Sequence, residues 1–231
     1  HVDAPERWRL EMVSEEGPET TIIDGHGAAP CMTIVDNLTF TLEGFTLTNC
    51  ATINTHLINE FHALYVQAYE HADVTIANNV FRDNPAIGAA IGIIPYFVNV
   101  TDFNVTIENN RIYGNHGAIV LDGSPYGGHI LIANNLIYDN WTSDRAAGFG
   151  ALYVAPNTGS AADISIVIVH NTITNNADTG LSVAQSSGLV VANNIVFGNT
   201  RDINDYYATS AIDHNLVGDA TGLEAANNLV G

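Results

Sequence analysis

A short phrase that ends in two asparagines recurs along this chain at intervals of 21 to 36 residues. Three of its copies read VTIANN, VTIENN and VVANN. Aligned on the second asparagine, the copies place one residue type in a single column: Asn79, Asn110, Asn135, Asn171, Asn194 and Asn215. A phrase that returns at such intervals is typical of solenoid proteins, in which each copy is one structural repeat.

Apolar residues keep fixed places around this column. One column lies three residues before it and another lies two residues after it, so both are predicted to point inward. A second asparagine column follows five residues on: Asn84, Asn115, Asn140, Asn176 and Asn199. Phe45 and Cys50 hold the two asparagine places in an earlier, less regular copy. Because an asparagine amide can hydrogen-bond its equivalent about 4.8 Å away in the next coil, we predict two structural asparagine ladders.

The segments between the asparagines are rich in β-forming residues and vary in length, and they return to the same register. This pattern predicts an all-β chain folded as a parallel β-helix of about seven coils, not a set of hairpins. Most coils carry a further strand after the second asparagine, which gives another inward row: Leu64, Ile91, Ile119, Leu152 and Leu181. Length variation falls in loops such as 96–103 and 141–150, where we expect function to lie.

With these motifs the chain resembles the right-handed parallel β-helix proteins of the pectin lyase-like superfamily, which include pectate lyases, polygalacturonases and many surface proteins. Residues 13–25, VSEEGPETTIIDG, resemble the first coil of secreted members. The resemblance implies right-handed coils and an extracellular or cell-surface location. It is specific for the fold and carries little information about activity.

Composition supports a single domain over residues 1–231, with no low-complexity linker and no apolar run long enough to cross a membrane. The net charge of −19 arises because 25 acidic residues face only six Arg and no Lys. Such a chain repels polyanions, so we exclude nucleic acid as a partner. An acidic, lysine-free surface favours a saline or extracellular setting, and lineage composition is the alternative explanation.

Cys31 and Cys50 fall about one coil apart, so a disulfide between them is the expected state, with two buried thiols as the alternative. Neither end of the chain shows the polar cap that a solenoid needs. Asn227 and Asn228 restart the repeat close to the last residue. We therefore expect either a piece of a longer chain or open ends that contact another subunit or another copy, as in end-to-end stacking.

A lyase of the related superfamily needs a basic residue to abstract a proton and acids to hold calcium. The best candidates are Arg82 and Arg111 on adjacent coils, with Glu108 nearby. The acids do not cluster as a calcium site would require, so no cofactor is expected and calcium belongs only to this alternative. No complete lyase, polygalacturonase or epimerase motif is present, which favours a non-catalytic protein.

Aromatic and polar residues also gather on and after the further strands. Tyr65 and Tyr153 are predicted at equivalent outward positions, and tyrosine faces interleaved with amides and acids are typical of glycan binding. The alternative is that these tyrosines pack under loops. The candidate binding residues are Tyr65, Tyr69, Tyr96, Tyr126, Tyr153, Gln67 and Asp122.

The histidines are assigned structural places. His62 and His71 flank a strand and are expected at the surface, while His170 and His214 replace the first asparagine of the repeat and are expected to serve the ladder. Together these observations predict an exported structural or adhesive β-helix that stacks end to end or contacts polysaccharide. The alternative is a lyase or glycoside hydrolase that acts on an acidic polysaccharide.

Overall fold

The computed structural model describes residues 8–28, 30–35, 38–51, 62–69, 71–85, 88–95, 102–123, 127–141, 150–156, 163–184, 188–205, 211–219 and 227–231. In that part of the chain every regular element is a β-strand. No helix there is long and apolar enough to cross a membrane.

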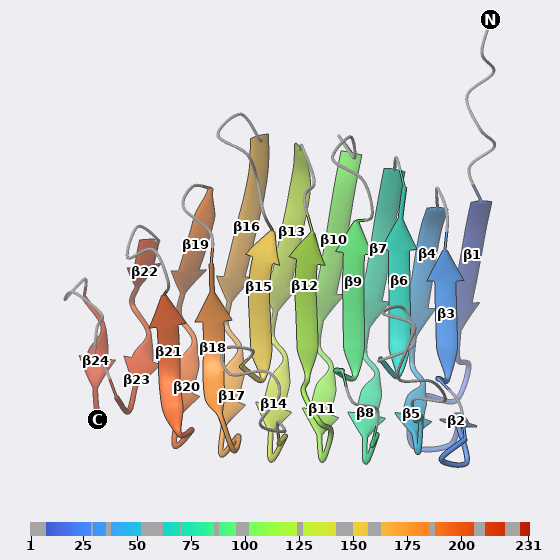
Figure 1. Cartoon of the computed structure of the whole chain (residues 1–231), viewed down its shortest axis with the longest axis horizontal. Helices are drawn as coiled ribbons and strands as arrows, with labels where there is room; N and C mark the ends of the chain where they lie inside the picture. Colours follow the sequence, from blue (N-terminus) through green and yellow to red (C-terminus); the bar gives the residue numbers. More distant parts are fainter. Residues whose placement is uncertain are drawn as a thin grey trace, which may run out of the picture.

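The strands form three parallel sheets that run the length of the molecule (Figure 1). Sheet A has eight strands: β1 (Trp8–Val13), β4 (Leu38–Glu43), β7 (His71–Ala77), β10 (Asp102–Glu108), β13 (Gly127–Ala133), β16 (Asp163–Val169), β19 (Leu189–Ala192) and β22 (Ala211–Asp213). Sheet B has nine short strands: β2 (Ile22–Asp24), β5 (Thr46–Thr48), β8 (Val80–Arg82), β11 (Arg111–Tyr113), β14 (Leu136–Tyr138), β17 (Thr172–Thr174), β20 (Ile195–Phe197), β23 (Leu216–Val217) and β24 (Leu229–Val230). Sheet C has seven: β3 (Met32–Val35), β6 (Leu64–Ala68), β9 (Ile91–Pro95), β12 (Ile119–Gly123), β15 (Leu152–Pro156), β18 (Thr179–Val183) and β21 (Arg201–Asp205).

Each coil contributes one strand to each sheet in the order A, B, C, and the chain then advances to the next coil. Ile76 of β7 pairs with Ile107 of β10, which pairs with Ile132 of β13, so the sheet register follows the columns of the sequence. This arrangement is a parallel β-helix, as the sequence predicts.

The core is a set of aliphatic stacks inside the coils. All three predicted inward columns are confirmed, because their members are at most 5 % exposed. In sheet B only the middle residue of each strand points inward, for example Phe81, Ile112 and Ile137, all fully buried. Most strands of sheet B have only three residues, so the first and the third residue of each face outward.

The first asparagine ladder is confirmed in atomic detail. Asn110 Oδ1 accepts the backbone N–H of Asn79 at 2.9 Å and the Asn79 amide Nδ2 at 3.2 Å. The Asn110 Nδ2 in turn donates to Ile76 O at 2.8 Å and to Asn135 Oδ1 at 3.0 Å. The same pattern continues to Asn215, whose amide donates to Asn228 Oδ1 at 3.1 Å. Each amide thereby satisfies turn backbone that would otherwise be buried without a partner.

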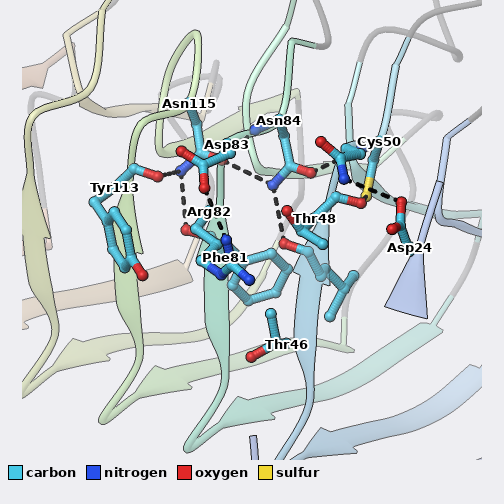
Figure 2. A network of polar contacts seen from close by, with 12 residues as sticks. Asp24, Thr46, Thr48, Cys50, Phe81, Arg82, Asp83, Asn84, Tyr113 and Asn115 are labelled. Carbon is cyan, nitrogen blue, oxygen red and sulfur yellow. Dashed lines mark hydrogen bonds and ion pairs between the residues drawn. The ribbon is translucent and has the colours of Figure 1, made fainter. Parts of the chain in front are cut away.

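The second ladder lies where each coil passes from sheet B to sheet C (Figure 2). Cys50 N donates to Asn84 Oδ1 at 2.9 Å, and the Asn84 amide donates to Asn115 Oδ1 at 2.8 Å. The ladder ends on the carboxylate of Asp202. Its Oδ1 accepts the backbone N–H and the side-chain Nδ2 of Asn199, each at 3.0 Å, and its Oδ2 accepts the backbone N–H of Asp219 at 2.7 Å. An acceptor-only group suits this last place because all three partners are donors.

The residue before each ladder asparagine adopts a left-handed conformation. Asn78, Asn109 and Asn134 have φ between 55° and 58°, a region that asparagine tolerates better than most residues. His170 and His214 occupy the same place, with φ of 57° and 55°, and both are exposed. The prediction that these histidines belong to the ladder is therefore wrong, because their position turns the backbone and directs the side chain to solvent.

A disulfide joins Cys31 and Cys50, with Cα atoms 5.2 Å apart. Cys31 directly precedes β3 and Cys50 follows β5, so the bond ties two successive coils together. The described residues contain no free cysteine.

Candidate functional site

The outer face of sheet C carries the tyrosines that the sequence singles out. The register places Tyr65, Gly92, Val120 and Tyr153 in one outward row across β6, β9, β12 and β15. Tyr65 and Tyr153 therefore hold equivalent positions three coils apart. Tyr96 and Tyr126, which are also candidates, lie outside the described residues.

Tyr65 and Gln67 point outward from β6, yet each is only 1 % exposed. The His62 ring lies parallel to the Tyr65 ring, with centroids 5.7 Å apart, and it occupies the space beside Gly92. A Cβ on Gly92 would come within 2.4 Å of that imidazole ring. Tyr65 and Gln67 thus belong to a packed layer outside the sheet, and the expectation that they form an accessible surface is wrong.

His62 itself is buried, contrary to expectation, and so is His71. The His62 Nδ1 accepts the backbone N–H of Ala89 at 3.0 Å, which requires an unprotonated ring nitrogen. Burial lowers the pKa of His62 to about 4. The imidazole is therefore neutral at pH 7 and acts as a flat packing group between β6 and β9.

Three of the predicted binding residues remain accessible on this side: Tyr69, Tyr153 and Asp122 are each partly exposed. Asp122 lies two residues after Val120, the register partner of Tyr153, so these two side chains leave the same face of adjacent strands. Burial raises the pKa of the Asp122 carboxyl, and its Oδ1 accepts Gly123 N–H at 2.8 Å. The phenol ring of Tyr153 can pack on a sugar ring. The half-buried carboxylate of Asp122 can accept a hydrogen bond from a sugar hydroxyl.

The corner between sheets C and A holds a histidine–aspartate pair. His71 and Asp102 are the first residues of β7 and β10 and are register partners. The His71 Nδ1 lies 2.8 Å from Asp102 Oδ2, and Asp102 Oδ1 accepts Asn104 Nδ2 at 2.8 Å. Sequence reasoning missed this pair, although the signal was available. Both residues lie five positions before the inward column residues Ile76 and Ile107, so the column alignment already places them opposite each other.

The candidate lyase residues are not gathered at one point. Arg82 and Arg111 face outward on the neighbouring strands β8 and β11 of sheet B, offset by two residues in register. The Arg82 Nη1 lies 2.9 Å from Asp83 Oδ2 (Figure 2), and the Arg111 Nη1 lies 3.1 Å from Glu19 Oε1. Glu108 ends β10 in sheet A, beyond the turn that precedes Arg111. Each guanidinium group therefore has its own carboxylate partner.

Comparison with known proteins identifies the family. A family model described as a right-handed beta helix region matches residues 36–221. The chain belongs to the right-handed β-helix family. A search of curated proteins and a search of solved structures each returned no match. The β-helix and its handedness, expected from the sequence, are thus confirmed, and the family itself implies no activity.

The outer face of sheet B carries the predicted Arg82 and Arg111, and it also carries apolar residues that the sequence analysis did not single out. Its outward residues lie one and three positions after each first-ladder asparagine, and several are large and apolar: Tyr113, Leu136, Tyr138, Ile195, Phe197 and Leu216. The signal lay in the same alignment, in columns next to the inward one.

Metal ligands do not gather in the part of this β-helix that the structure describes. No group of three or more His, Cys, Asp or Glu side chains there could hold a metal ion.

Proposed function

We propose that this right-handed β-helix is an exported, non-catalytic surface protein that adheres to polysaccharide and contacts other copies end to end. The observation that carries the adhesive role is the partly exposed pair of Tyr153 and Asp122 on the outer face of sheet C, with Tyr69 on the same side. The lyase alternative depends on Arg82 and Arg111, and ion pairs with Asp83 and Glu19 already engage both. We therefore favour binding over catalysis.

Two features support export. The Cys31–Cys50 disulfide suits an oxidising compartment, because thiols in the cytosol are kept reduced. The net charge of −19 without a single lysine suits a protein that stays soluble in a saline medium.

Affinity electrophoresis through gels that contain polysaccharide tests the adhesive role. We expect at least one polysaccharide in a panel to retard the wild-type protein. Tyr153→Ala should weaken this binding about tenfold, because a stacked ring contributes on the order of 1–2 kcal/mol. Asp122→Asn, which keeps the shape and removes the charge, should weaken it less. Val190→Ala, a change at an exposed apolar residue of sheet A, is the control. Retardation that is equal for Tyr153→Ala and the wild type would remove Tyr153 from the site.

End-to-end contact is supported by the outermost strands of the described sheets. These are β1, β2 and β3 on one side and β22, β24 and β21 on the other, and an edge strand offers unpaired N–H and C=O groups to a further strand. Trp8 and Leu10 of β1 stand in inward columns, yet they are 67 % and 43 % exposed. A second copy placed there would cover them.

Electron microscopy at low and high salt tests this contact. We expect filaments whose axial repeat matches one copy, and more of them at high salt, because salt screens the repulsion between two chains of charge −19. Single particles under both conditions would count against stacking and would leave the adhesive role untouched.

A further inference from the structure

The outer face of sheet B carries a strip of mostly apolar side chains from β11 to β23, interrupted on β17 by Thr172 and Thr174. Leu136, Ile195, Phe197 and Leu216 are between 37 % and 46 % exposed. The rings of Tyr113 and Tyr138 stack at the other end of the strip, with centroids 4.9 Å apart and planes 18° from parallel. Large apolar side chains gathered on one face of such an acidic protein can pack against a partner.

Phe197 shows that this surface is built and not incidental. Its ring extends over the neighbouring strand, where a Cβ on Gly218 would lie 2.8 Å from Phe197 Cδ2. Any side chain at position 218 would displace the ring or the Asp202 carboxylate, whose Oδ2 would lie 2.7 Å from that Cβ. The ring nevertheless remains 46 % exposed, so it is held against the sheet while presenting apolar surface to solvent.

Charge restricts what the strip can bind. The outward residues of β14, β17, β20 and β23 are all uncharged, and their polar groups are the hydroxyls of Thr172, Thr174 and Tyr138. The outward Arg111 of β11 is charged, and its Nη1 lies 3.1 Å from Glu19 Oε1. Asp139 and Asp213 flank the strip without standing in it. A polyanion finds one base at the edge of the strip, Arg111, whose guanidinium group is already paired with Glu19. A polycation would prefer the acidic remainder of the surface, and a second copy would bring −19 against −19.

The dimensions of the strip restrict the partner further. Five strands at a spacing of about 4.8 Å span roughly 20 Å, and three residues across a strand span about 10 Å, which gives roughly 200 Å². A stable protein interface buries about 800 Å² on each partner, so the strip is too small for a globular partner. It matches the footprint of one extended chain.

An extended peptide is a poor occupant because it binds sheets by pairing with an edge. The backbones of β14, β17 and β20 are already paired on both sides. A sugar chain needs no backbone partner, because the C–H faces of its rings pack on aromatic and aliphatic side chains while its hydroxyls stay in water. We propose that the outer face of sheet B binds a single uncharged polysaccharide chain that lies along the axis of the β-helix. This site is separate from the one on sheet C and does not depend on it.

Affinity electrophoresis with hydroxyethylcellulose, xylan, galactomannan and dextran as neutral probes, and polygalacturonate as the charged probe, tests the proposal. We expect retardation by at least one neutral probe, little change between 0.05 M and 0.5 M NaCl, and none by polygalacturonate. The double change Tyr138→Ser with Phe197→Ser should reduce this affinity at least tenfold. Ile22→Ser, which removes an exposed apolar residue at the far end of the same sheet, should not change it.

The outcomes separate the two surfaces. Loss of binding in Tyr138→Ser/Phe197→Ser but not in Tyr153→Ala assigns the neutral glycan to sheet B, and the reverse assigns it to sheet C and overturns this inference. Failure of every neutral probe to bind also overturns it. Sedimentation velocity provides the remaining arm: a dimer that forms in the wild type and is lost in the double variant would assign the strip to a second copy instead.

Discussion

Replacing Asn135 by aspartate is expected to lower the free energy of unfolding by about 3–5 kcal/mol at pH 7, although the two side chains have nearly the same shape. Asn135 is 1 % exposed in the middle of the first ladder. Its Nδ2 lies 2.8 Å from Ile107 O, 3.0 Å from Ala133 O and 3.0 Å from Asn171 Oδ1. An aspartate oxygen at the place of Nδ2 would face three acceptors without a proton to share. The buried charge would keep only the N and Nδ2 donors of Asn110, which Asn135 Oδ1 already accepts at 3.0 Å.

Asn134→Asp is the matched control. Asn134 is the preceding residue of the same turn, it is exposed, and its φ of 55° is one that aspartate also tolerates. We expect this change to alter the free energy of unfolding by no more than about 0.5 kcal/mol. Urea unfolding of both variants at pH 7 gives the comparison, and equal costs at the two positions would contradict the role of the ladder.

Acid should partly rescue the Asn135→Asp variant. Burial disfavours the charged carboxylate, so its pKa in the folded state lies above the value of about 3.9 in the unfolded chain. Between these two values the folded state binds more protons, and the deficit relative to the wild type shrinks as the pH falls. The protonated acid can donate one hydrogen bond, which restores part of the asparagine pattern. A deficit that stays constant down to pH 4 would show that the charge is not the cause.

The sequence predicts the inside of this protein well because the inside repeats. Each coil must place an aliphatic residue at the same depth and an amide at the same turn, so Ile107 and Asn110 are visible in an alignment of the chain with itself. The first and second ladders, the three inward rows and the parallel register all follow from that requirement. The end of the second ladder departs from the repeat, because Asp202, three residues after Asn199 and outside the asparagine column, supplies the last acceptor.

The outside is less predictable because it does not repeat. Tyr65 and Tyr153 share a row, yet Tyr65 is 1 % exposed and Tyr153 is partly exposed. The difference comes from His62, which packs against Tyr65 and over Gly92, and no column of the alignment carries that information. Alternation along a strand shows which way a side chain leaves its sheet. It does not show which other residues of the chain then cover that side chain.

His62 should make the protein lose stability in weak acid. Burial lowers the pKa of this imidazole to about 4 in the folded state, whereas an unfolded histidine titrates near 6.5. Between these two values the unfolded chain binds more protons, so the free energy of unfolding falls as the pH is lowered. The full stabilisation is present above about pH 6.5, and about 3 kcal/mol is lost by pH 4. Protonation also ends the hydrogen bond from Ala89 N–H to Nδ1.

His62→Asn isolates this contribution. An amide oxygen can still accept the Ala89 N–H, but the side chain no longer titrates, so the variant should lose less stability than the wild type between pH 7 and pH 4.5. It should also be less stable than the wild type at pH 7, because the ring that packs on Tyr65 is gone. Urea unfolding of both proteins at pH 7 and pH 4.5 gives the loss of unfolding free energy for each. Subtracting one loss from the other cancels the titration of the carboxylates, which both proteins share. His129→Asn, which removes an exposed histidine of sheet A, controls for the loss of a histidine as such.

An equal loss of stability between pH 7 and pH 4.5 for the wild type and His62→Asn would show that the acid sensitivity lies elsewhere. A smaller loss in the variant would establish that the neutral His62 imidazole stabilises the folded protein and that its protonation contributes to the loss of stability in weak acid.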